Sequence, residues 1–116
     1  MFSIDYQSRV PIYEQIINEI ERFVALGVLK PKEQIASIRD LAKDLGINPN
    51  TVRKAYCELE NREVITTIST KGTFISEKTN LVIEKKIASS IEKISEIIDE
   101  LERLGIDKKE ILTKLK

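Results

Sequence analysis

The 116-residue sequence contains no histidine and no tryptophan, and it has a single cysteine, Cys57. A catalytic triad built on histidine, a zinc site of cysteine and histidine ligands, and an intramolecular disulfide are therefore excluded. A glycine-rich phosphate-binding loop is missing as well. Carboxylates, lysines and hydroxyls remain, but so short a chain has few apolar residues with which to enclose a substrate. We expect no enzyme activity, no metal site and no cofactor.

An excess of charge of one sign is also missing, because nineteen basic side chains balance nineteen acidic ones. Net charge therefore gives no support for a nucleic-acid partner. Neither an apolar run long enough to cross a membrane nor the pattern of a signal peptide is present, so we expect a cytoplasmic protein without membrane association. With 41% hydrophobic and 33% charged residues, the chain has the composition of one globular domain, or of one small domain with an appendage.

Apolar residues at steps of three and four predict three helices in the first half of the chain. The first follows Pro11, the second starts at a capping box opened by Ser37, and the third has Asn48 as its N-cap and extends over about residues 49–62. A short turn with Gly46 separates the second helix from the third, as in a helix-turn-helix. The expected buried stripes are Ile12, Ile16, Ile20, Phe23 and Val24, then Ile38, Leu41, Ala42 and Leu45, then Val52, Ala55, Tyr56 and Leu59.

The hydrophobic period changes over residues 64–76, where two short β-branched runs flank Ser69–Gly72 and predict a hairpin, or wing. Residues 77–80 are the only plausible linker, and a long helix is expected from about Leu81 until Gly105, followed by a short helix capped by Asp107. The predicted fold is mainly α with a small β-hairpin. A winged helix-turn-helix DNA-binding domain takes residues 1–76, and a linker and two-helix C-terminal dimerisation region take residues 77–116.

The long helix carries a wide apolar stripe that could pack on its own domain or on a second chain. A helix of about 24 residues extends roughly 36 Å, and a face of this width is not left in water. Because the winged domain already has a core of its own, the pattern favours a homodimer. The stripe consists of Ile87, Ile91, Ile94, Ile98 and Leu101.

A helix-turn-helix reads DNA when the exposed face of its second helix is polar and not acidic. Here no acidic residue occurs between Asp44 and Glu58, so this face is locally cationic although the chain is neutral. Many three-helix proteins use the same pattern only for packing, and the pattern alone leaves both interpretations open. The face consists of Asn50, Arg53, Lys54 and Cys57.

Several motifs in residues 9–76 resemble the winged helix-turn-helix of GntR-family bacterial transcription regulators, in order and without gaps. The resemblance implies that Arg39, Asn50, Thr51, Arg53 and the wing glycine Gly72 lie at the DNA. We add Ser37, Asn48, Lys54 and Lys71 as further DNA-binding candidates. The tail resembles the short-tailed YtrA-like branch by size and character only. The motifs are Pro11-Ile-Tyr-x-Gln-Ile16, Gly27-x-Leu29-x-Pro31, Ser37-x-Arg-x-Leu-Ala42, Leu45-Gly-x-Asn-x-Asn-Thr-Val-Arg-Lys-Ala-Tyr56, Leu59-Glu60 and Lys71-Gly-Thr-Phe74.

The chain departs from the family pattern mainly in the wing. Glu63 stands where the family has glycine, Ile68 where it has an arginine, and Thr70 where it often has glycine, while Ile35-Ala36 replaces Leu-Pro. These differences predict that the wing contributes less to DNA binding than in relatives.

The predicted function is that of a sequence-specific transcription regulator, a repressor, which binds an inverted-repeat operator as a homodimer through its third helix. Neither the operator nor an effector ligand can be identified from the residues. The alternative is a winged-helix module for protein–protein interaction without specific DNA binding, which the neutral net charge and the altered wing keep open.

Overall fold

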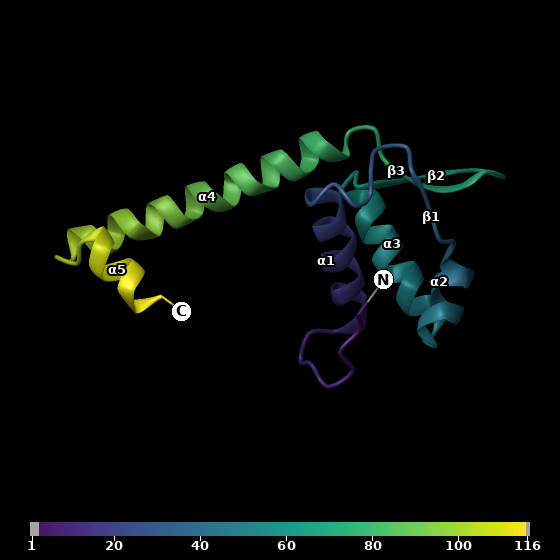
Figure 1. The fold of residues 1–116 in the computed structure, drawn as a ribbon, viewed down its shortest axis with the longest axis horizontal. Helices are drawn as coiled ribbons and strands as arrows, with labels where there is room; N and C mark the ends of the chain where they lie inside the picture. Colours follow the sequence, from purple (N-terminus) through teal and green to yellow (C-terminus); the bar gives the residue numbers. More distant parts are fainter. Residues whose placement is uncertain (1–2, 116) are drawn as a thin grey trace. The chain divides into compact units, whose positions relative to one another are not determined.

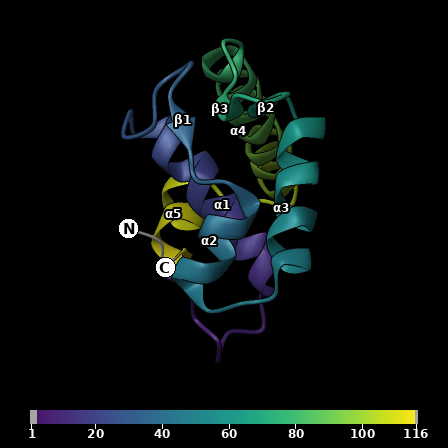
Figure 2. The ribbon, with the colours of Figure 1, turned by 90° about the vertical axis from the view of Figure 1, so that its right-hand side faces the viewer.

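The computed structural model describes residues 3–115 and divides the chain into two compact units, Met1–Ile83 and Glu84–Lys116. Figure 1 shows the course of the chain and Figure 2 looks onto the side of the first unit that carries α2, α3 and the strands. The prediction of a mainly helical winged helix-turn-helix fold is confirmed. The elements are α1 (Ile12–Ala25), β1 (Gln34–Ile35), α2 (Ile38–Leu45), α3 (Pro49–Asn61), β2 (Ile65–Ile68), β3 (Gly72–Ile75), α4 (Thr79–Arg103) and α5 (Lys108–Lys114).

The core of the first unit lies where α3 packs against both α1 and α2. All four residues of the predicted α3 stripe are buried, and so are Ile16, Ile20, Phe23 and Val24 of α1. On α2 only Leu41 and Ala42 are fully buried, whereas Ile38 and Leu45 are half-buried at the edge. Burying these apolar faces against one another is the main stabilisation of the three-helix unit.

The helix-turn-helix begins and ends where local side chains satisfy the backbone. Ser37 Oγ accepts a hydrogen bond from the Asp40 N–H at 3.1 Å, and Asn48 Oδ1 accepts one from the Asn50 N–H at 2.8 Å. Between these caps, Gly46 ends α2 with a φ of +66°, a left-handed conformation that glycine adopts without steric cost. The predicted caps of α2 and α3 are therefore confirmed.

The segment before α1 is fastened to the helical core by one glutamine. Gln15 Nε2 donates to the carbonyl oxygens of Asp5 and Val10, each at 2.9 Å, and Gln15 Oε1 accepts from the Asp5 N–H at 2.8 Å. Tyr6 donates its hydroxyl to the Leu45 carbonyl at the end of α2, at 2.8 Å. These bonds connect the start of the chain to both helices that flank α3.

A buried carboxylate links α1 to the end of α3. Glu21 is 7% exposed and lies 3.3 Å from Arg62 Nη1, while Arg62 Nε donates to Glu58 Oε1 at 3.0 Å. Partial desolvation by itself lowers the pKa of Arg62, but the hydrogen bonds and charges of Glu58 and Glu21 outweigh it, so the pKa is raised. The guanidinium stays charged and balances the carboxylate that α1 buries.

The wing has one strand more than the sequence predicted. β2 and β3 form the expected antiparallel hairpin, with Ile65 opposite Ile75 and Ile68 opposite Gly72. β1 adds to the other side of β3, which gives the strand order β1-β3-β2. A two-residue strand carries no hydrophobic period of its own, so its pairing is visible only in three dimensions.

The prediction of a linker over residues 77–80 and a helix from about Leu81 is wrong at Thr79 and Asn80, because α4 begins at Thr79. Thr79 is fully buried and its hydroxyl donates to the Val64 carbonyl at 2.7 Å. Ile83, one turn later, is 7% exposed and joins the core of the first unit. The division of the chain thus falls inside α4. The assignment of DNA binding to residues 1–76 and dimerisation to residues 77–116 stays a prediction.

The second unit contains the rest of α4 and α5, and it buries little. Asp107 Oδ1 accepts from the Glu110 N–H at 2.8 Å, which confirms the predicted cap of the last helix. Ile111 is the only buried residue in the described part of this unit, while Ile98 and Leu101 are half-buried. Most of the other large apolar side chains of this unit are exposed, and Ile91, for example, is 59% exposed.

Candidate nucleic-acid interface

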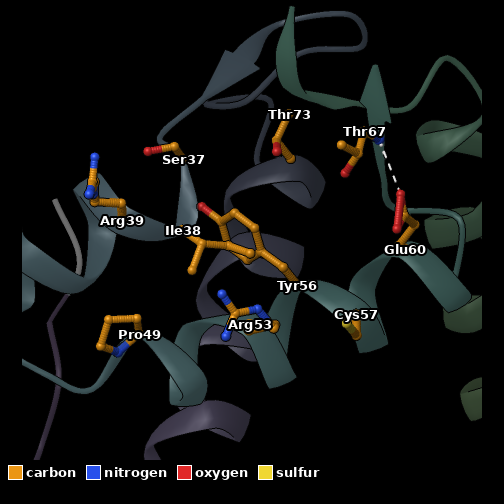
Figure 3. A pocket seen from close by; sticks show the side chains of 10 residues that line it. All are labelled: Ser37, Ile38, Arg39, Pro49, Arg53, Tyr56, Cys57, Glu60, Thr67 and Thr73. Carbon is orange, nitrogen blue, oxygen red and sulfur yellow. Dashed lines mark hydrogen bonds between the residues drawn. The ribbon is translucent and has the colours of Figure 1, made fainter. Parts of the chain in front are cut away.

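A surface hollow of about 440 Å³ lies between the start of α2, the exposed side of α3 and the hairpin (Figure 3). It brings together Ser37 at the N-cap of α2, Arg39 from α2 and Arg53 from α3, three of the residues proposed from the sequence to meet DNA. Arg39 and Glu60 lie at opposite ends of the hollow in Figure 3. Two guanidinium groups therefore share one concave surface, although in the sequence they lie on different helices on either side of the turn.

The caps of α2 and α3 leave polar hydrogens available at the start of each helix. Ser37 and Asn48 each use an oxygen as an acceptor for the helix backbone. The Ser37 hydroxyl hydrogen and the Asn48 amide hydrogens are not consumed by these caps, since both side chains are donors as well as acceptors. These side-chain hydrogens suit a phosphate oxygen. At the start of α3, Pro49 has no N–H and the N–H groups of Asn50 and Thr51 are bonded to Asn48.

Arg53 is oriented by its own helix. Its Nη1 donates to Asn50 Oδ1 at 2.6 Å, and both side chains are exposed. One hydrogen bond leaves most of the guanidinium donors free and turns the group toward the N-terminal end of α3. Thr51, beside this pair, is half-buried.

Tyr56 connects the two helices beneath the hollow. Its hydroxyl donates to the Ala36 carbonyl at 2.7 Å, which holds the residue before the Ser37 cap against α3. Burial raises the pKa of the Tyr56 phenol above its ordinary value, so the hydroxyl remains a donor at every physiological pH. The spacing between Arg39 and Arg53 thus depends on a buried side chain.

Lys54 does not line the hollow that contains Arg39 and Arg53. Its Nζ lies 3.9 Å from the centre of the Tyr13 ring on α1, and it lines a separate recess with Tyr13 and Glu14. A cation over an aromatic ring is attracted by the electron density of the ring face. Helical periodicity places Lys54 beside Arg53 but cannot show that α1 provides a partner for it.

The tip of the wing carries Lys71, whose backbone N–H donates to the Ile68 carbonyl at 3.0 Å and closes the turn. Gly72 follows with a φ of +124°, and a Cβ there would lie 2.6 Å from Gln34 Nε2. Gln34 Nε2 is the end of a flexible side chain and can move, but L side chains rarely adopt this φ, so the backbone favours glycine here whatever its role at DNA.

Two departures from the family pattern lie at backbone positions that favour glycine. Glu63 has a φ of +63° and Thr70 a φ of +68°. A side chain at positive φ meets the backbone unfavourably, and a β-branched residue such as threonine does so more than most. The structure therefore gives the physical reason why glycine suits both ends of this hairpin.

Three residues near the wing or α3 were not predicted as part of the site: Gln34, Glu60 and Tyr13. Glu60 and Tyr13 both fall within motifs that carry the family resemblance, so the signal for them was present but had no assigned role. Gln34 lies outside those motifs, and its contact with the wing spans 37 residues.

Within the described residues no group of three or more acidic or cysteine side chains is arranged to hold a metal ion. Over the same residues, no helix has the length and apolar character needed to cross a membrane.

The family model of bacterial regulatory proteins, gntR family, matches residues 12–75. The chain belongs to the GntR family. It is 41% identical over 109 residues to the HTH-type transcriptional repressor YtrA of Bacillus subtilis (strain 168), covering 92% of this chain and 83% of the relative.

Solved structures share this fold. A transcriptional antiterminator from Listeria monocytogenes EGD-e is 48% identical, with a TM-score of 0.73 over 97% of this chain and 85% of that one. The DNA-binding domain of AraR in complex with operator ORX1 has a TM-score of 0.59 over 65% of this chain and 93% of that one, and at 24% identity it shows the shared fold alone. As a member of the GntR family, the chain is a DNA-binding transcription regulator with a winged helix-turn-helix.

Proposed function

We propose that this GntR-family chain is a homodimeric repressor that binds an inverted-repeat operator with α3 of each protomer in the major groove. The observation that carries the proposal is the hollow in which Ser37, Arg39 and Arg53 converge. A concave cationic surface next to the exposed side of α3 suits a phosphate backbone that borders a groove. The repressor assignment is supported by the 41% identical relative from Bacillus subtilis, the HTH-type transcriptional repressor YtrA.

Within this site, Arg53 reads a base and Arg39 holds a phosphate. A guanidinium one turn from the start of the recognition helix reaches a guanine edge with two hydrogen bonds, and the bond to Asn50 turns Arg53 in that direction. Asn50 and Thr51 lie on the same turn and complete the base-reading group. Arg39 and Ser37, together with the Asn48 cap, position the duplex.

The remaining candidates take lesser roles. Lys54 reaches DNA only by leaving the Tyr13 ring, so it contributes a phosphate contact at the side of α3. Lys71 is placed at the wing tip, where Gly72 permits the turn, and it contacts the backbone beside the groove. These contacts add affinity but carry little sequence information.

The homodimer is supported by the apolar face of α4. Ile87, Ile91 and Ile94 are 54%, 59% and 52% exposed, and Ile97 beside them is 56% exposed. Half-buried Ile98 and Leu101 continue the same stripe toward the end of the helix. Isoleucines at steps of four and three are typical of helices that pair along their length. A second copy of α4 covers this face and supplies the second recognition helix for an inverted repeat.

The repressor acts in the cytoplasm, needs no cofactor and has no catalytic activity. Membership of the GntR family supports all three statements, because the regulators of this family act by binding DNA.

The proposal is tested by selecting bound duplexes from a random pool with the purified full-length chain at two salt concentrations. Enrichment of a palindrome with half-sites about one turn apart, roughly 34 Å, is expected. Binding of all duplexes alike, lost steeply with salt, would show non-specific binding only. No binding of any duplex would favour the protein-interaction module instead.

A further inference from the structure

The outer edge of the wing is held by a side chain from α3. In the sheet order β1-β3-β2, β2 is an edge strand, so the backbone groups on its outer side have no strand partner. Glu60, in the last turn of α3, accepts a hydrogen bond from the Thr67 N–H in the middle of β2, with 3.1 Å between Oε2 and N. Figure 3 shows this bond at the end of the hollow away from Arg39.

The other side of the wing is held by Gln34 of β1. Its Nε2 donates to the Lys71 carbonyl at 3.1 Å, at the tip of the hairpin, and packs over Gly72. The wing is thus fastened on both edges, by Glu60 to the recognition helix and by Gln34 to the strand that leads into α2.

This fastening matters more here because the hairpin is weak by itself. Each strand has four residues, and the turn contains Thr70 at positive φ. An isolated two-stranded hairpin is marginally stable in water. Ile68 stands where the family pattern has an arginine, so Lys71 is the only basic residue between Arg62 and Lys78. Whether Lys71 reaches DNA therefore depends on the position of the hairpin relative to α3.

We propose that Glu60 is a positioning residue for DNA binding, which holds β2 against α3 so that Lys71 meets the phosphate backbone while α3 lies in the groove. The inference rests on the proposed contact between the wing and DNA. A carboxylate beside a DNA-facing hollow would by charge alone repel phosphate and weaken binding. The hydrogen bond to Thr67 has the opposite effect on DNA affinity, because losing it should weaken binding.

Two substitutions separate charge from position. Glu60→Gln and Glu60→Ala both remove the negative charge, but only glutamine keeps an oxygen that can accept from the Thr67 N–H. On an operator selected by the wild-type chain, we expect Glu60→Gln to bind at least as tightly as wild type. Glu60→Ala should bind at least threefold more weakly than Glu60→Gln. Equal affinities for the two variants would overturn the proposal.

Hydrogen exchange of the full-length chain provides the readout in the absence of DNA. The Thr67 amide should exchange faster in Glu60→Ala than in wild type, while Glu60→Gln should retain its protection. Unchanged protection in Glu60→Ala would show that the bond is not present in solution, and this also overturns the proposal. Glu77 is a matched control, because it is exposed and pairs with Lys32 at 3.4 Å. Glu77→Ala and Glu77→Gln should bind DNA alike.

A double-mutant cycle with Lys71 connects the bond to the wing contact. If Glu60 acts by placing Lys71, then Glu60→Ala should cost no further affinity once Lys71→Ala is present, whereas independent effects would multiply. Independent effects would overturn the proposal. If the wild-type chain itself selects no operator, the proposed function fails, and the exchange measurement still decides whether Glu60 holds the wing.

Discussion

The two units of the chain treat their apolar residues in opposite ways. In the described residues up to Ile83, α1, α2, α3 and the strands bury theirs in one shared core. From Glu84 to residue 115 only Ile111 is buried, and Ile87, Ile91, Ile94 and Ile97 of α4 are exposed. Both regions have strong helical periodicity, so periodicity alone does not distinguish an apolar face that packs within the chain from one that stays exposed in the single chain.

The difference shows where each unit obtains its stability. The first unit has tertiary packing and polar links such as Arg62–Glu21 within itself, so its folding should not depend on protein concentration. The second unit has one long helix and one short helix with little buried between them, so its stability should come from association.

The largest effect is expected from charges on the exposed stripe of α4. Ile91→Glu together with Ile94→Glu should give a monomer in sedimentation, because two carboxylates cannot be buried between helices without partners. Loss of the second recognition helix should weaken operator binding about 100-fold or more. Lys93→Glu changes the net charge by the same amount outside this stripe and should remain dimeric. A double variant that stays dimeric would show that the stripe is not the interface.

A large effect of a different kind is expected in the core of the first unit. Leu59 is fully buried, and Leu59→Ala should lower the free energy of unfolding by about 2–5 kcal/mol in urea titration. Leu26 is 63% exposed in the same unit, so Leu26→Ala should change the free energy of unfolding by less than about 0.5 kcal/mol. Dimerisation of the Leu59 variant at low urea should persist. Similar costs for both substitutions would contradict the burial pattern.

An intermediate effect should divide the two arginines of the hollow. Arg53→Ala should reduce discrimination between the operator and a variant altered at one symmetric base pair, by about 1–3 kcal/mol. Arg39→Ala should weaken binding to both duplexes alike and reduce the log–log salt slope by about 1.8 for a dimer, at roughly 0.9 per phosphate. Titrations of both duplexes across a salt series measure both quantities.

Arg22, which is exposed on α1 and lies 3.8 Å from Glu19, is the control for these two variants. Arg22→Ala should leave affinity and discrimination unchanged. If Arg39→Ala abolished discrimination while Arg53→Ala preserved it, the two roles would be reversed.

The smallest effect is expected at the wing turn. Thr70→Gly should stabilise the first unit by up to about 1 kcal/mol in thermal unfolding, because it removes a β-branched side chain from a left-handed position. Thr66→Gly, made in the regular part of β2, should instead destabilise it, since glycine weakens a strand interior. A loss of stability in both variants would mean that the turn tolerates threonine without strain.

Most of the local structure could be predicted because it depends on neighbouring residues. The caps at Ser37, Asn48 and Asp107 are set by a side chain and a backbone N–H within three residues. The buried stripe of α3 follows from spacing along one helix. The family resemblance rests on the same local motifs, and the match over residues 12–75 confirms it.

Contacts between distant parts of the chain were decided only by the tertiary structure. The strand β1, the partner of Lys54 on α1 and the contact of Gln34 with the wing tip join residues that no helical or strand period relates. Thr79 lies in a polar stretch that suggests a linker, yet it is buried, and its hydroxyl donates a hydrogen bond to the Val64 carbonyl. By itself the sequence determined which segments are helical or extended and which faces are apolar, since those depend on local geometry. Packing between elements far apart in the chain decided which apolar faces are buried and which polar side chains contact each other.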